Sequence, residues 1–274
     1  MKGVYAFHGC DSKCGVTMVA QSVAEQLADK NPGKSVLFAV LCAGKNAQFA
    51  AEGTASIDCF KERIVSSVAV RREELEDLKI SDNLYYLGGI DCEDEAGIYF
   101  PDMAMSFLRH MSAEFDYVVV DTGSNLDNGL AVGALLGSDM NFMVLSQNDA
   151  CLERYRKMRK LYDSLNFSFD AFVLNKFRVR DVYGVDEVKR YIISAYKDIF
   201  TVCDTGLSRE AESEKKTFTE LKEKRYMGCI AGIVEEIEAK AESRFERKII
   251  EARSFGIRKR LGIGEKNGKE RISS

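Results

Sequence analysis

The stretch that decides the fold is VYAFHGCDSKCGVTMVAQSVAEQL, residues 4–27. It begins with the apolar run 4–7, which is short enough for a buried strand, and continues into a loop of small residues. The segment after the loop predicts a helix, because apolar side chains recur at helical spacing at Val16, Val19, Val23 and Leu27. A loop in this place presents backbone N–H groups at a helix N-terminus, where they and the helix dipole can hold an anion. The sequence therefore predicts a phosphate-binding loop.

The loop lacks the lysine that usually contacts the phosphates. The standard motif ends in Gly-Lys-Ser/Thr, whose lysine reaches the β- and γ-phosphates and whose hydroxyl reaches magnesium. Here Gly15 and Thr17 are kept, and Val16 replaces the lysine. One charge-assisted contact worth roughly 1.5–3 kcal/mol is missing unless another cation supplies it. Lys13 is the nearest candidate, and Gly9 with Gly15 lets the backbone approach a ligand closely.

These residues resemble the loop of the ParA/MinD superfamily of deviant P-loop ATPases, which reads KGGVGKT and is followed by a helix. Segment 11–28 aligns with that pattern without a gap. Asp11 then stands at the family's signature lysine, which reaches across a nucleotide-sandwich dimer, and Val16 stands at the ordinary P-loop lysine. Lys13 falls on a glycine position. The resemblance implies ATP and Mg²⁺ as cofactors and a homodimer as the assembly.

Further segments resemble the family's strands and follow in the family's order. Segment 35–41 resembles the second strand, which in the family ends in an Asp-x-Asp that helps to activate water and lies near the metal. Val40 and Cys42 occupy those positions, and neither can act as a base or as a metal-linked carboxylate. Segments 83–88 and 141–146 resemble two further core strands.

Two polar residues end strands of this series. Segment 115–123 resembles the Walker B strand and retains Asp121, which is placed to hold magnesium directly or through water. Segment 169–175 resembles the strand whose terminal asparagine, here Asn175, contacts adenine. Each residue has a purely structural alternative, in which it only caps the turn after its strand. In all, the resemblance covers roughly residues 1–230.

Strands that alternate with helices predict an α/β fold with a mostly parallel, doubly wound sheet and helices on both faces. The ligand crevice then lies at the carboxyl ends of the strands. We expect a P-loop domain over residues 1–250, and a basic amphipathic or disordered tail over residues 251–274. The expected nucleotide-binding residues are Gly9, Cys10, Asp11, Ser12, Lys13, Cys14, Gly15, Val16, Thr17, Met18 and Asn175, with Thr17 and Asp121 at the metal.

The composition agrees with a single cytoplasmic domain. The chain has 274 residues, is 46% hydrophobic and carries a net charge of −4, so it can bury a sizeable core. It shows no N-terminal signal and no apolar run near the roughly 18 residues that span a bilayer. Its eight cysteines lie scattered without a CxxC pair, which indicates reduced thiols in a reducing compartment.

Three residues around the loop have alternative interpretations. Cys10 and Cys14 are core residues in the simplest interpretation. Redox sensitivity or metal binding is the alternative, because a thiol at a helix N-terminus can have a lowered pKa. His8 ends the first strand, where it caps structure in the simpler interpretation and touches a phosphate in the other.

The end of the chain changes character. Segment 210–224 is dominated by charge, which is typical of a solvated helix face or loop, and segment 230–250 predicts a helix. Segment 253–263 is basic and apolar at once, which suits a helix on anionic lipid and resembles the membrane-targeting helix of MinD. A solvated tail is one alternative. A patch for nonspecific DNA binding is another, which the overall acidity of the chain disfavours.

Within the superfamily, the loop GCxxxCGVT looks closest to the CpaE/TadZ group of pilus-assembly localisation factors. A MinD-like member outside that group is the alternative. Two functions compete. In the first, the protein is a nucleotide-dependent positioning switch for a bacterial assembly or localisation machinery, in which ATP and Mg²⁺ bind, a dimer forms and slow hydrolysis resets it. In the second, it is a pseudo-ATPase scaffold that binds protein partners without nucleotide. The missing lysines and the missing Asp-x-Asp favour little or no hydrolysis, whereas Gly15, Thr17 and Asp121 favour binding.

Overall fold

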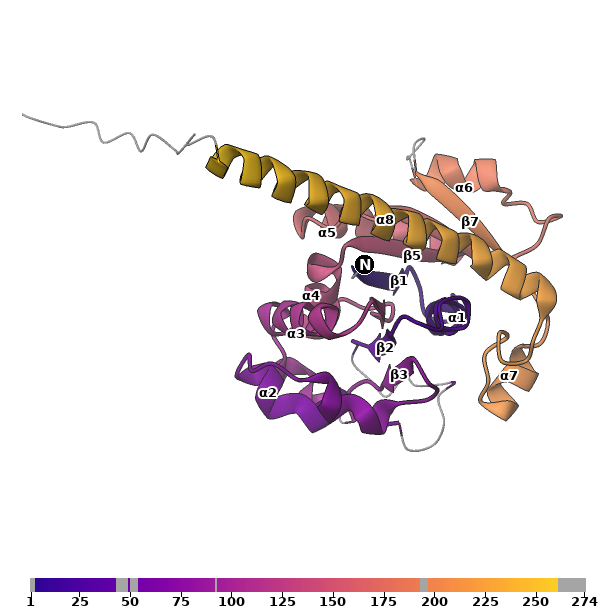
Figure 1. Ribbon diagram of the computed structural model, residues 1–274. Coiled ribbons are helices and arrows are strands. Elements are labelled where there is room, and N and C mark those ends of the chain that lie inside the picture. The colour runs from indigo at the N-terminus through magenta and orange to yellow at the C-terminus, as the bar shows by residue number, and fades with distance from the viewer. Residues whose placement is uncertain (1–2, 43–48, 50–53, 92, 193–196, 261–274) are drawn as a thin grey trace, which may run out of the picture.

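A seven-stranded sheet in which every paired strand is parallel runs through the molecule (Figure 1). The computed structural model describes residues 3–42, 49, 54–91, 93–192 and 197–260. The strand order is β3-β2-β4-β1-β5-β6-β7. The strands are β1 (Gly3–Gly9), β2 (Val36–Val40), β3 (Leu84–Leu87), β4 (Tyr117–Asp121), β5 (Met140–Ser146), β6 (Ala171–Phe177) and β7 (Asp198–Cys203).

Helices cover both faces of the sheet, which confirms the predicted α/β fold class (Figure 1). One face packs against α1 (Val16–Lys30) and α8 (Lys224–Arg260). The other face packs against α3 (Pro101–Glu114), α4 (Gly129–Gly137), α5 (Asp149–Ser164) and α6 (Val185–Ile192). Short helical segments complete the chain: η1 (Ile57–Phe60), α2 (Lys61–Val65), η2 (Arg72–Leu78), η3 (Glu93–Ile98) and α7 (Ser208–Glu214).

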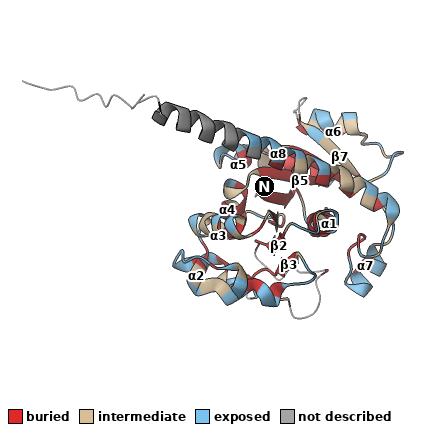
Figure 2. Cartoon of the chain, viewed as in Figure 1, coloured by how far each residue is buried: buried red, intermediate tan, exposed pale blue. Residues whose placement is uncertain are grey.

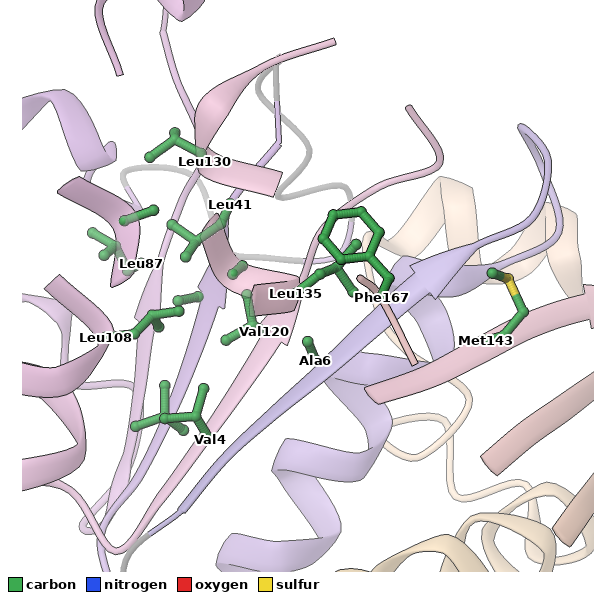
Figure 3. Close-up of a cluster of buried hydrophobic side chains, with 14 of the residues drawn as sticks. Val4, Ala6, Leu41, Leu87, Leu108, Val120, Leu130, Leu135, Met143 and Phe167 are labelled. Atoms are coloured by element: carbon green, nitrogen blue, oxygen red, sulfur yellow. The ribbon is translucent and has the colours of Figure 1, made fainter. Parts of the chain in front are cut away.

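The continuous apolar strands divide their side chains between two buried clusters, one on each face of the sheet (Figure 2). On β1, Val4 and Ala6 join the cluster under α3, α4 and α5, which Figure 3 shows in close-up. Tyr5 and Phe7, between and beyond them, join the cluster under α1 and α8. Burial of each large apolar side chain stabilises the fold by roughly 1.5–3 kcal/mol. A strand buried on both faces therefore reads as an unbroken apolar run.

Helices α3 and α4 pack so closely that glycine is required between them. A Cβ atom added at Gly129 would lie 2.1 Å from the Tyr99 carbonyl oxygen. One added at Gly133 would lie 2.1 Å from the Pro101 carbonyl oxygen. Neither carbonyl can move away freely, because each belongs to the backbone at the start of α3. The two glycines therefore set the distance between these helices.

The strand register brings the predicted site residues to one edge of the sheet. Phe7 on β1 pairs with Asp121 on β4, and Ser146 on β5 pairs with Asn175 on β6. Strands β1, β2, β4, β5 and β6 lie where the sequence predicts them. The sequence analysis did not predict β7, which closes the sheet beside β6 and is half-buried over most of its length.

The last helix is longer than predicted. α8 begins at Lys224 and continues past residue 250 to Arg260, so it crosses the expected boundary between domain and tail. Its first half is fastened to the end of α1, where Lys30 Nζ lies 2.7 Å from Glu238 Oε2. Figure 1 shows its far end projecting from the sheet. Residues 261–274, including part of the predicted basic segment, lie outside the described residues. No described helix is long and apolar enough to cross a membrane.

Candidate functional site

Gly15 forms the junction between the predicted loop and α1. It adopts a left-handed backbone conformation with φ of 88° and serves as the N-cap of the helix. A Cβ at this position would lie 2.4 Å from Asn175 Nδ2, so both the conformation and the close approach require glycine. The cap residue offers no side-chain hydrogen bond to the first turn of α1. The first N–H groups of the helix are thus available to an anion.

Three side chains from elsewhere in the chain hold the carbonyl groups of the loop. Arg154 Nε on α5 donates to the Cys10 carbonyl at 2.9 Å. At the end of β6, Asn175 Nδ2 donates to the Cys14 carbonyl at 2.9 Å, and the next residue, Lys176, donates from Nζ to the Lys13 carbonyl at 2.8 Å. These hydrogen bonds fix the backbone conformation of the loop. Asn175 is thus engaged in bracing the loop as well as lining the site.

Thr17 and Asp121, the predicted metal residues, lie in direct contact. Thr17 Oγ1 donates to Asp121 Oδ2 at 2.6 Å, and the Gly123 N–H donates to Asp121 Oδ1 at 2.8 Å. Asp121 is fully buried, and this burial raises the pKa of its carboxyl group to about 6 against the two hydrogen bonds, which lower it. A nearby cation would favour the charged carboxylate. Oxygen ligands of this kind suit Mg²⁺ when phosphate oxygens complete the set.

A cavity of about 490 Å³ opens in front of the loop and reaches the ends of β6 and β7. Most of the predicted nucleotide-binding residues line it: Asp11, Ser12, Lys13, Gly15, Val16, Thr17, Met18 and Asn175. The volume lies within the range of small-molecule and cofactor sites, roughly 300–1,000 Å³. The cavity therefore joins the loop at the N-terminus of α1 to a second wall at the ends of β6 and β7.

The remaining three predicted residues of the loop do not line this cavity. Gly9 is the last residue of β1, and Cys10 and Cys14 are buried behind the loop. The Cys10 thiol donates to the Cys151 carbonyl at 3.0 Å, and burial raises the pKa of Cys14 to about 12. The expectation of a lowered thiol pKa at this helix N-terminus is therefore wrong for Cys14, because burial outweighs the helix.

Two alternative interpretations are also corrected. His8 points away from the cavity and is fully buried, where its Nδ1 lies 3.0 Å from Thr122 Oγ1 and its ring stacks on Phe169. It has no access to a phosphate at the loop. Among the described residues, no group of three or more histidine, cysteine, aspartate or glutamate side chains gathers to hold a metal ion. A cysteine metal site at the loop is thus unsupported.

The far wall of the cavity comes from residues that the sequence analysis did not single out. Lys176 follows Asn175 and reaches back to the loop, whereas the turn after β7 contributes the side chains opposite the loop. Besides Lys176, the lining residues that the sequence analysis did not single out are Phe49, Gly123, Ser124, Cys203, Asp204, Thr205, Ser208, Glu212 and Phe218. The pair Asn175 and Lys176 at the end of a predicted strand was the one signal in the sequence for this wall.

The end of β2, where the resemblance to the ParA/MinD superfamily would place two carboxylates, is apolar, as the sequence predicts. Val40 and Cys42, at the end of β2, are buried in the cluster under α1. Val40 pairs in register with Asp121 on β4. Asp11, at the position of the signature lysine, lies 3.8 Å from Arg154 Nε of the same chain.

Known proteins with the same fold were found by their structures. No family model and no curated protein matches the sequence. A ParA family ATPase from Chlorobium tepidum TLS superposes with a TM-score of 0.73 at 17% identity, over 85% of this chain and 97% of that one. The chain has the ParA/MinD fold.

Two further structures agree with this assignment. The septum site-determining protein MinD from Pyrococcus horikoshii OT3, in complex with Mg-ADP, gives a TM-score of 0.64 at 16% identity, over 86% of this chain and 96% of that one. The MinC:MinD cell division protein complex of Aquifex aeolicus gives a TM-score of 0.68 at 13% identity, over 86% of this chain and 96% of that one. The loop and Asp121 thus lie within a fold that a ParA family ATPase shares.

Proposed function

We propose that this protein binds ATP with Mg²⁺ and acts as a spatial positioning or assembly factor with weak or absent ATP hydrolysis. The observation that carries the proposal is the cavity, which joins the N-terminus of α1 to the ends of β6 and β7. A nucleotide fits this shape with its phosphates at the loop and its base at the far wall. The ParA/MinD fold and the Mg-ADP bound to the Pyrococcus MinD support this placement.

The chain's own residues fit a magnesium ion beside the phosphates. The Thr17 hydroxyl and the buried Asp121 carboxylate offer two oxygen atoms that already lie 2.6 Å apart. When bound, the ion would neutralise part of the phosphate charge. The Thr17 to Asp121 contact would then hold the start of α1 against β4.

Hydrolysis lacks a suitable base at the expected position. Neither Val40 nor Cys42 can accept a proton from water at neutral pH, and both are buried. Val16 supplies no positive charge to the transferred phosphate, where charge stabilisation is the main catalytic requirement. These replacements favour nucleotide binding with weak or absent hydrolysis.

The assembly state and the partners belong to the same proposal. A homodimer and a bacterial assembly or localisation machinery of the CpaE/TadZ type fit the resemblance of the loop, and the MinC:MinD complex shows that a protein of this fold can bind a protein partner. The basic tail 251–274 would add a contact with the inner face of the membrane. The acidic net charge of −4 argues against nucleic acid as the partner.

Calorimetric titration with a non-hydrolysable ATP analogue and Mg²⁺, followed by sizing of the complex, tests the central claim. Micromolar binding with dimer formation is the expected result. Thr17→Ala should weaken binding in the presence of Mg²⁺, whereas the matched control Thr17→Ser keeps the hydroxyl and should bind like the wild type. If millimolar analogue produces no heat, the pseudo-ATPase scaffold is the correct alternative.

The membrane contact needs its own test. The full chain should co-sediment with vesicles that contain anionic lipid, whereas a chain truncated before Arg253 should stay in the supernatant. Neutral vesicles serve as the control for the charge. Equal co-sedimentation of both chains would remove the tail from the proposal.

A further inference from the structure

The site needs a cation that the loop itself no longer provides. Val16 occupies the position of the ordinary P-loop lysine, and its side chain is buried in the apolar cluster under α1. Among the described residues that line the cavity, Lys13 and Lys176 are the two with positively charged side chains. The sequence alone pointed to Lys13, because it lies within the loop.

The structure favours Lys176 on geometric grounds. Its side chain crosses from the end of β6 to the loop, where Nζ donates to the Lys13 carbonyl at 2.8 Å. Its Cε lies 3.8 Å from the place where a Cβ on Gly15 would be, next to the first turn of α1. A left-handed conformation with φ of 56° turns the chain at this residue. The ammonium group is thus held beside the N–H groups that would receive a phosphate.

Lys13 is less well placed. Both lysines are exposed, but no described residue holds the Lys13 ammonium group by a hydrogen bond or an ion pair, and the Lys13 carbonyl is the group that Lys176 holds. An ammonium group has three N–H donors, and the bond to the Lys13 carbonyl uses one of them. The remaining donors of Lys176 can reach an anion in the cavity without breaking the contact that fixes the side chain.

We propose that Lys176, from the end of β6, supplies the positive charge to the phosphate chain of the bound nucleotide in place of the lysine missing at Val16. This inference rests on the proposed nucleotide binding. The contact with the phosphates, which the loop motif ordinarily makes with its own lysine, would then come from the end of β6. A hydrogen bond between charged groups is worth enough that its loss should weaken binding about 10- to 100-fold.

The experiment compares Lys176→Met with Lys176→Arg, with Lys13→Met as the rival cation, and with the control Lys160→Met, which removes an exposed lysine of α5 that does not line the cavity. Each variant is titrated calorimetrically with ATP analogue, ADP and AMP in the presence of Mg²⁺, and with adenosine by displacement. Lys176 is exposed, so its variants should keep the wild-type unfolding temperature. We expect Lys176→Met to lose about 10- to 100-fold in affinity for the ATP analogue and ADP, and almost none for adenosine. Lys176→Arg and Lys160→Met should stay within about threefold of the wild type, and Lys13→Met should lose less affinity than Lys176→Met.

Each other outcome overturns a definite claim. If Lys176→Met weakens adenosine as much as the ATP analogue, the residue only braces the loop, and the phosphate role is wrong. If Lys13→Met instead shows the loss that depends on phosphate, the cation is Lys13. If the wild type binds none of the four ligands, the proposed function fails and takes this inference with it.

Discussion

Replacing the buried Glu25 by glutamine should make the protein more stable at neutral pH. Glu25 lies on α1 and is only 6% exposed. Its carboxylate accepts hydrogen bonds from Tyr86 Oη at 2.7 Å, from Gln21 Nε2 at 3.0 Å and from the Thr217 hydroxyl. Burial nevertheless raises the pKa of Glu25 from 4.5 to about 7, because desolvation outweighs these bonds. The folded protein therefore holds this proton more tightly than the unfolded chain.

The size and sign of the effect follow from that shift. Because the pKa of Glu25 is higher in the folded state, its contribution to the free energy of unfolding is fully present below pH 4.5. That contribution is lost as the pH rises through about 7. A shift from 4.5 to about 7 corresponds to about 3 kcal/mol. Glu25→Gln keeps the shape and cannot ionise. Its stability relative to the wild type should therefore rise by about 3 kcal/mol between about pH 4.5 and pH 8.

The measurement is urea unfolding, followed by circular dichroism across this pH range, for the variant and the wild type. The wild-type curve alone is insufficient, because burial and then Arg154 lower the pKa of His8 to about 4. That shift contributes stability that is lost as the pH falls from 6.5 to about 4, which opposes the effect of Glu25. The difference between the two proteins isolates Glu25. Parallel curves would refute the reasoning, and Glu235→Gln, at an exposed position of α8, is the control.

Three further substitutions have definite expected outcomes. Gly133→Ala should destabilise the fold by about 1–3 kcal/mol or more, because its Cβ would meet a backbone oxygen at 2.1 Å, while Gly137→Ala, whose nearest contact is 3.4 Å, should change the unfolding temperature little. Gly15→Ala should abolish the binding of ATP analogue in calorimetry, because φ is 88° and a Cβ would lie 2.4 Å from an amide nitrogen. Lys30→Ala should lower the free energy of unfolding in urea by about 1 kcal/mol or less, because the Lys30 side chain is 49% exposed and solvent screens its ion pair with Glu238.

The fold was predictable from the sequence because the strands are buried on both faces. A run such as 117–121 has no polar side chain until Asp121, so it reads as a central strand without any alignment. The helix after the loop was equally clear from its apolar spacing. Thr17 and Asp121 were singled out by the resemblance of the loop and of the strand that ends at Asp121. The structure brings their side chains into contact because β1 and β4 are parallel neighbours.

The far wall of the cavity was not predictable, for physical reasons that particular residues show. Phe49, Asp204 and Phe218 come from three segments that are far apart in the sequence, and only the folded chain brings them together. Strand β7 was not predicted because it is an edge strand of mostly half-buried residues, and its sequence has no clear hydrophobic periodicity. The raised pKa of Cys14 depends on burial, which a position in the loop does not reveal.

The replacements in the loop are consistent with one another within a single chain. Asp11 lies 3.8 Å from Arg154 Nε, which also donates to the Cys10 carbonyl, so a lysine at residue 11 would place two cations side by side. Val16 belongs to the apolar cluster under α1 and also lines the cavity, so this position offers a ligand an apolar contact and no charge. A dimer of such chains would bring carboxylates, not lysines, from residue 11 to the partner. In the proposed nucleotide complex, cations from other elements of the chain would balance the phosphate charge. Of the two described cations that donate to the loop, Arg154 and Lys176, it is Lys176 that lines the cavity.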